Sequence, residues 1–108
     1  MPNVDSKFPG AEKHEVPLAD AKKYVQNHRK NPKAPTIKAG AFHRAIIDKI
    51  LAQDGCDGIR IYHAQLDDGS PTFVVVGITA AGADLTQNTI AESIMPCPPF
   101  CDAASELL

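Results

Sequence analysis

Apolar residues recur at helical spacing near the start of the chain. Leu18, Ala21 and Val25 are separated by three and four residues, and this pattern predicts a helix over about residues 17–30. The stretch NPKAP at residues 31–35 ends it, because a proline disfavours the helical conformation in the residue before it.

A second apolar stripe of the same kind follows. Phe42, Ile46 and Ile50 are four residues apart and predict a helix over about residues 40–53. Gly55 is expected to end this helix, because glycine adopts the left-handed conformation that terminates many helices.

The middle of the chain is rich in β-branched and aromatic residues. The segments GIRIYHAQL and PTFVVVGIT, separated by Asp-Asp-Gly-Ser, predict a β-hairpin over about residues 58–79. A two-residue type I′ turn at Asp68 and Gly69 would place Tyr62 opposite Val75.

This register divides the hairpin into two faces. One face is aliphatic and is expected to lie under the helices; its members are Ile59, Ile61, Val74, Val76 and Ile78. The other face carries Arg60, Tyr62, Phe73 and Val75. Exposed aromatic rings beside a valine are typical of an interface, so these four residues are the predicted binding surface. Either the segment from Leu85 to Phe100 or a second subunit is expected to cover them.

The two ends of the chain show little periodicity. Residues 1–15 combine proline, glycine and mixed charge and are expected to form a flexible lead-in. Residues 89–95, TIAESIM, fit either a third strand or a short helix. The prediction is therefore one small α+β domain over residues 16–108, with two helices packed on a small antiparallel sheet that contains the hairpin.

Composition agrees with this prediction. The chain has 108 residues, 44% of them hydrophobic and 22% charged, as in an ordinary globular domain. No apolar run approaches the ~18 residues that cross a bilayer, and the first residues lack the apolar stretch of a secretion signal. We expect a soluble, cytoplasmic protein without a membrane partner.

Two of the three cysteines flank a pair of prolines, in the sequence CPPFC. An extended path would separate the Cα atoms of Cys97 and Cys101 by roughly 12 Å, about twice the usual span of a disulfide. Three states stay open: buried thiols in a rigid tail, a disulfide that needs a tight turn, and metal ligands. If a disulfide forms, it is expected to join this pair and to leave Cys56 reduced.

A zinc site would need the three cysteines and one histidine. Their number suits zinc, but the spacing does not, because paired ligands are usually separated by two residues. No metal or other cofactor is therefore expected. His43 and His63 are interpreted as partly buried structural residues. Because the sequence contains no phosphate-binding loop and no G-x-S-x-G motif, no catalytic residue is assigned and an enzyme is disfavoured.

Charge is segregated along the chain. Residues 21–44 contain seven basic residues and no acidic one, whereas the remainder contains four basic and thirteen acidic residues. Such a segment could bind nucleic acid or another polyanion. A solvated basic face near a helix C-terminus is the stronger explanation, and only Tyr24 and Phe42 are present to stack on bases. Nucleic acid is not the expected partner.

The order of these parts resembles a family of small uncharacterised bacterial proteins. The similarity covers about residues 17–101 and includes the Gly-x-Arg-Ile-Tyr strand, the second strand ending in VVVGIT and the terminal PCPPFC. That family has no established activity, so the resemblance implies an intact domain and no site residue.

These observations favour a non-catalytic binding or assembly module. It would associate with a second copy of itself or with another protein, through the predicted binding surface or an exposed strand edge. Two alternatives stay open: polyanion binding by residues 21–44, and a thiol-redox or zinc protein built on Cys97 and Cys101.

Overall fold

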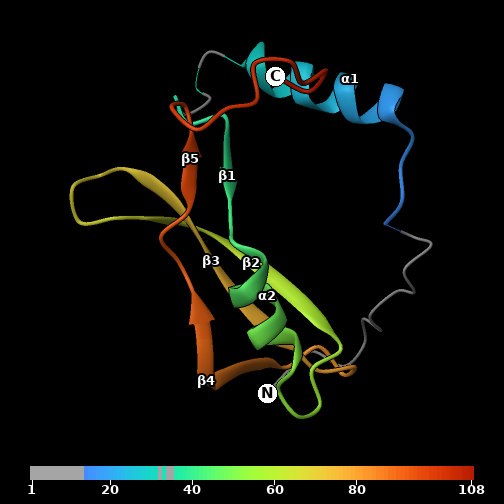
Figure 1. Ribbon diagram of the computed structural model, residues 1–108, viewed down its shortest axis with the longest axis vertical. Coiled ribbons are helices and arrows are strands. Elements are labelled where there is room, and N and C mark those ends of the chain that lie inside the picture. The colour runs from blue at the N-terminus through green and yellow to red at the C-terminus, as the bar shows by residue number, and fades with distance from the viewer. Residues whose placement is uncertain (1–13, 32, 34–35) are drawn as a thin grey trace. The chain divides into compact units, whose positions relative to one another are not determined.

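The computed structural model describes residues 14–31, 33 and 36–108. Residues 1–13 of the predicted lead-in lie outside the described residues. The described residues form helices α1 (Leu18–Arg29) and α2 (Arg44–Leu51) and strands β1 (Ala39–Ala41), β2 (Gly58–Gln65), β3 (Pro71–Ile78), β4 (Asp84–Ala91) and β5 (Met95–Cys97) (Figure 1). Strands β2, β3 and β4 form an antiparallel sheet in that order, and β1 pairs with β5. The predicted α+β class is confirmed.

Contacts group the predicted 16–108 domain into two compact units. The sheet unit contains residues 40–95, with α2 and the three-stranded sheet. The α1 unit contains α1, the described residues that follow it up to residue 39, and residues 96–108.

Helix α2 covers one face of the sheet. Ile50 is 0% exposed and packs with Val75 and Ala91 in the core; half-buried side chains around this cluster are Phe42, Ile46, Cys56 and Ile59. Burying one such side chain contributes about 1.5–3 kcal/mol. Gly77 of β3 lies under the helix, where an added Cβ would come 2.8 Å from Cys56 Sγ. An alanine at this position would therefore crowd Cys56 and Gln53 after the helix and Ile50 within it.

The predicted start of this helix at residue 40 is wrong. Residues 39–41 form β1, and α2 begins after His43, whose Nδ1 accepts a hydrogen bond from Ala45 N at 3.0 Å. The side chain of His43 thus satisfies one of the free N–H groups of the first turn, which fixes the start of the helix.

The hairpin has the predicted strands in a different register. Ile61 lies opposite Val75, one position away from its predicted partner. The loop has three residues, 67–69, and is closed by hydrogen bonds from Leu66 N to Ser70 O (2.8 Å) and from Gly69 N to Leu66 O (2.9 Å). Gly69 adopts a φ of +91°, as glycine does at this position of a three-residue loop.

One extra loop residue shifts every cross-strand pair and exchanges the faces of one strand relative to the other. The face under α2, called the α2 face, carries Ile59, Ile61, His63, Phe73, Val75 and Gly77; the second face carries Arg60, Tyr62, Val74, Val76 and Ile78. Both predicted faces are therefore split, and the prediction that Arg60, Tyr62, Phe73 and Val75 share one face is wrong.

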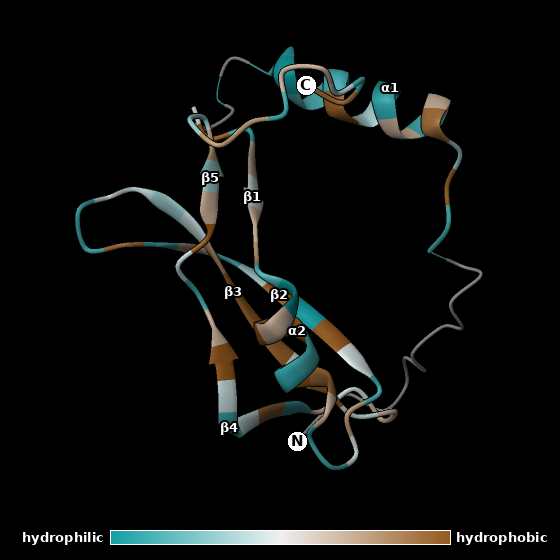
Figure 2. Cartoon of the chain, in the orientation of Figure 1, coloured by the Kyte–Doolittle hydropathy of each residue, from teal (hydrophilic) through white to brown (hydrophobic). Residues whose placement is uncertain are grey.

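Strand β3 lies in the middle of the sheet and is buried on both faces. Val75, Val76 and Ile78 are all buried, which explains why this strand is apolar along most of its length instead of alternating with polar residues (Figure 2). Strand β2, at the edge, shows mixed hydropathy in the same view.

Strand β4 continues the sheet. Residues 80–82 repeat the geometry of the first loop, with hydrogen bonds from Thr79 N to Ala83 O (3.0 Å) and from Gly82 N to Thr79 O (2.9 Å). The segment predicted to cover the hairpin therefore places its first part beside β3 as a third strand.

The pairing of β4 with β3 is interrupted by a bulge. Gly77 pairs with Leu85, whereas the preceding Val76 pairs with Ile90. Gln53, just after α2, holds this bulge: its Oε1 accepts a hydrogen bond from Thr89 N at 3.2 Å, and its Nε2 donates to the Ile50 carbonyl at 2.8 Å.

The α1 unit is held by contacts between segments distant in sequence. Helix α1 agrees with its predicted bounds to within one residue and has no fully buried side chain. Arg29 Nη2 donates to the Leu107 carbonyl at 2.7 Å, and Lys38 N donates to the Cys97 carbonyl at 2.6 Å. Cys97 is linked to Cys101 by a disulfide. No helix in the described ranges is long and apolar enough to cross a membrane.

Candidate functional site

The outer edge of β2 is one surface on which backbone groups are available, since β2 and β4 are the two outer strands of the three-stranded sheet. Within the described residues, β2 pairs with β3 alone. The hydrogen bond from Leu66 N to Ser70 O marks that pair as a hydrogen-bonded one. Antiparallel pairs alternate between hydrogen-bonded and non-hydrogen-bonded types, so the Tyr62–Val74 pair is also hydrogen-bonded.

The residues between these pairs direct their backbone away from β3. Four residues of β2 lie in non-hydrogen-bonded pairs, and their N–H and C=O groups therefore point to the outer edge: Ile59, Ile61, His63 and Gln65. The pairing of β3 with β4 agrees with this assignment. The hydrogen bond from Thr79 N to Ala83 O marks the Gly77–Leu85 pair as hydrogen-bonded, so the backbone groups of Gly77 point to β4 and not to β2.

Two large side chains of this edge are open to contact. Ile61 is 55% exposed on the α2 face, and Tyr62 is 43% exposed on the second face. A partner strand along the edge would meet an apolar side chain on one side of the sheet and an aromatic ring on the other.

Arg60 and Tyr62 are fixed by a carboxylate of β4. Both reach over β3 to Asp84: Arg60 Nη1 donates to Oδ1 and the Tyr62 hydroxyl donates to Oδ2. Arg60 Nη1 also donates to the Gly82 carbonyl at 3.1 Å. The hydrogen bond to Asp84 raises the pKa of Tyr62 above its ordinary value of 10.0, and the same carboxylate raises the pKa of Arg60. The cluster therefore holds a neutral phenol and a guanidinium cation in place.

The structure brings together only two of the four predicted binding residues. Arg60 and Tyr62 share the Asp84 cluster, whereas Val75 is 1% exposed in the core under α2. Phe73 is half-buried, and its ring lies 5.5 Å from that of His63, its cross-strand neighbour.

Asp84 was missed because it lies twenty-four residues from Arg60 in the sequence. The signal that could have found it is the turn-forming AAGAD sequence at residues 80–84. A three-residue loop there places Asp84 opposite Ile78, on the face that carries Arg60.

The two histidines singled out in the sequence are exposed, so the interpretation that they are partly buried is wrong. His43 caps α2 through its Nδ1, and His63 lies on the edge strand β2. His43 is exposed because it precedes α2 as its N-cap, and His63 is exposed on an outer strand of the sheet.

The cysteines do not form a thiol cluster. Cys97 and Cys101 have Cα atoms 4.8 Å apart and are disulfide-bonded. Cys56 is half-buried, and its Sγ donates a hydrogen bond to the Gly58 carbonyl at 3.2 Å. Among the residues that the structure describes, no three His, Cys, Asp or Glu side chains are grouped so that they could hold a metal ion.

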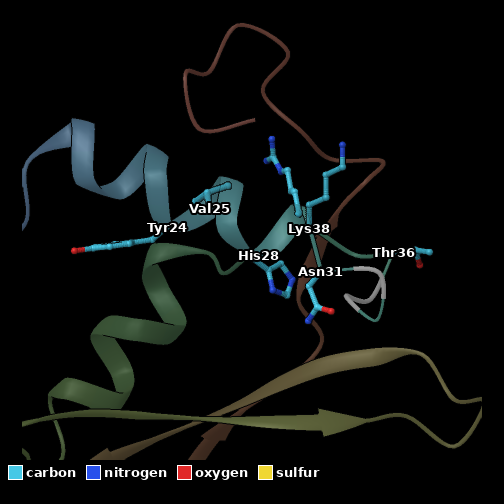
Figure 3. Close-up of a pocket in the computed structure, with 7 residues that line it drawn as sticks. Tyr24, Val25, His28, Asn31, Thr36 and Lys38 are labelled. Atoms are coloured by element: carbon cyan, nitrogen blue, oxygen red, sulfur yellow. The ribbon is translucent and has the colours of Figure 1, made fainter.

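The basic segment contributes to a hollow of about 550 Å³ in the α1 unit. Its described lining residues are Tyr24, Val25, His28, Arg29, Asn31, Thr36 and Lys38. None of these is acidic. In Figure 3 the Tyr24 ring points away from Lys38 and Thr36, so it does not form one recognition surface with them.

Comparison with known proteins adds no further assignment. No family model, no curated protein and no solved structure matches the chain. The resemblance to a small bacterial family stays a prediction, and the functional argument depends on the geometry of this surface.

Proposed function

We propose that the protein is a small non-catalytic binding module that accepts an extended partner strand along the outer edge of β2. The observation that carries this proposal is the outward direction of the N–H and C=O groups of Ile59, Ile61 and His63. A strand added to a sheet edge gains affinity from such backbone groups and specificity from alternate side chains.

The composition of β2 supports this proposal. Natural edge strands are commonly protected by proline, lysine or short length. Strand β2 is eight residues long, contains neither proline nor lysine, and has Arg60 as its one Lys or Arg side chain. That guanidinium is bound to Asp84, so it does not guard the edge.

The first part of the test uses two extended peptides, and the second part uses two proline variants of the protein. The peptide has the β2 sequence GIRIYHAQ with blocked ends, and the control peptide has proline at every second position. We expect the first peptide to slow amide hydrogen exchange at Ile59, Ile61 and His63, and the control peptide to leave exchange unchanged.

The variant Ile61→Pro removes an outward N–H and leaves the bonds to β3 intact. It should fold and lose peptide binding. Tyr62→Pro removes an N–H that bonds β3 and should disrupt the hairpin. If the three amides exchange equally fast with and without peptide and at every protein concentration, the proposal is wrong.

A second candidate function is anion binding by the α1 unit. The hollow described above has His28, Arg29 and Lys38 among its lining residues and no described acidic residue, which favours a polyanion. If this candidate is right, the charge reversal Lys38→Glu should weaken binding of a single-stranded oligonucleotide and reduce its salt dependence, because each phosphate contact releases counterions. Absence of saturable, salt-sensitive binding in a fluorescence titration would exclude it.

A further inference from the structure

We infer that the disulfide between Cys97 and Cys101 is a site of thiol–disulfide exchange with a small thiol that carries a carboxylate. The bridge lies in the α1 unit, at the wall of a second hollow, of about 280 Å³, called the disulfide hollow. Its described lining residues include both cysteines, Arg29 and Lys38. A volume close to the lower limit of ligand sites suits a small molecule. The inference is independent of strand addition at β2.

The two cysteines differ in exposure. Cys97 lies in β5 and is 7% exposed, and its carbonyl accepts a hydrogen bond from Lys38 N at 2.6 Å. Cys101 follows this strand and is half-buried. Phe100 beside it is 58% exposed and also lines the disulfide hollow. A thiol that enters the hollow therefore reaches Cys101 more readily than Cys97.

The charged residues that line the disulfide hollow favour an anion. Arg29 and Lys38 are basic, and Asp102 is the one acidic side chain among the described lining residues. Asp102 Oδ1 already accepts a hydrogen bond from Ala104 N at 3.1 Å, and Arg29 is positioned by its hydrogen bond to the Leu107 carbonyl. Because opposite charges attract at short range, a thiol with a carboxylate should be preferred to a neutral one.

The size of the closed loop argues against a purely structural bridge. Three residues separate the two cysteines in the sequence. Closing so short a loop removes little conformational entropy from the unfolded chain, so this bridge stabilises the fold less than one that closes a long loop. Accessible disulfides are also the ones that are reduced most readily.

The exchange balances without a further oxidant or reductant. The thiolate of the small molecule attacks Cys101 Sγ, the S–S bond breaks, and its electron pair leaves on Cys97 Sγ, which takes a proton from water. The product is a mixed disulfide at Cys101. The cations of the hollow assist this step, because positive charge favours a departing thiolate. A second small thiol then attacks the sulfur of the bound one, which releases a small disulfide and leaves both cysteines reduced.

The first test compares two thiols of the same shape, 3-mercaptopropionate and its neutral amide, at low ionic strength so that screening is weak. Acid quenching and mass spectrometry measure the rate at which each thiol opens the bridge in the folded protein. Lys38→Gln should lower the ratio of the first rate to the second by about fivefold, because one charge pair in water is lost. The control Lys23→Gln, an exposed lysine outside the hollow, should leave this ratio unchanged.

Peptide mapping after alkylation then locates the mixed disulfide. We expect the small thiol on Cys101 and the alkyl group on Cys97, and the reverse distribution would overturn the assignment of the attacked sulfur. A rate ratio that is the same in the wild-type chain and in Lys38→Gln would exclude recognition of the carboxylate. A bridge that opens only after urea unfolds the chain would be structural, and the inference would be wrong.

Discussion

Ile50 and Leu51 are neighbours in α2 with opposite environments, since Ile50 is 0% and Leu51 is 45% exposed. Replacing Ile50 with alanine should lower the free energy of unfolding by about 2–5 kcal/mol, because a cavity remains in the core. The matched variant Leu51→Ala should change it by no more than about 0.5 kcal/mol. Urea denaturation of both variants measures the difference; equal losses would contradict this orientation of α2 on the sheet.

Tyr62 provides a pH-dependent test of the Asp84 cluster. Its pKa is raised mainly by the hydrogen bond to Asp84, so the stabilising contribution of this bond is complete below the ordinary value of 10.0. It is lost as the pH rises through the higher pKa of the folded protein.

The chain contains two tyrosines, so the variant Tyr24→Phe leaves Tyr62 as the only phenol. Phenolate absorbance should then show a midpoint above pH 10.0. The substitution Asp84→Ala should lower that midpoint, and an unchanged midpoint would show that the carboxylate does not hold the phenol.

At the scale of the element, the β2–β3 loop determines the faces of the hairpin. Gly69 has a φ of +91°, a conformation that costs an alanine about 1–2 kcal/mol. Gly69→Ala should therefore lower hairpin stability by about this amount, and Gly69→Asn should lower it less, because asparagine tolerates left-handed conformations better. Equal stability of glycine and alanine in thermal unfolding would contradict the left-handed conformation of Gly69.

In the hairpin, the local sequence pattern predicts the positions of the two strands but not their register. Strand positions follow from β-branched composition, and both strands lie within one residue of their predicted bounds. The register depends on whether the turn closes at Asp67 or at Leu66, which differ by one residue. Asp68 favours the longer loop, because its Oδ1 accepts a hydrogen bond from Ser70 N at 2.9 Å.

At the scale of the whole molecule, the disulfide can be checked by counting thiols. Alkylation of the denatured, unreduced chain should modify Cys56 alone, and reduction should make all three cysteines reactive. Replacing Cys97 and Cys101 with serine should destabilise the protein by no more than about 2 kcal/mol, since the closed loop is short. Three reactive thiols without reduction would contradict the bridge.

The disulfide between Cys97 and Cys101 also concerns the cellular compartment of the protein. Disulfides persist in oxidising compartments and are rare in the cytoplasm. The cytoplasmic location therefore stays a prediction to which the disulfide lends no support, and the redox state of the native protein is the measurement that decides it.

The sequence by itself determined the features that depend on near neighbours. The positions of α1, β2 and β3 follow from the spacing of apolar residues and from β-branched composition, and the α+β class follows from their order. Arg60 and Tyr62 could be selected because both lie on one strand, two residues apart, and therefore on one face whatever the register.

Tertiary structure alone decided the features that join distant residues. Which residues lie beside Arg60 and Tyr62 depends on the lengths of the two loops. Val75, predicted to share their face, lies in the core, and Asp84 binds both side chains in its place. The outward N–H groups of β2 are likewise set by the ladder to β3. A one-residue change in loop length alters few local contacts but reassigns every cross-strand neighbour, which is why sequence pattern could not predict it.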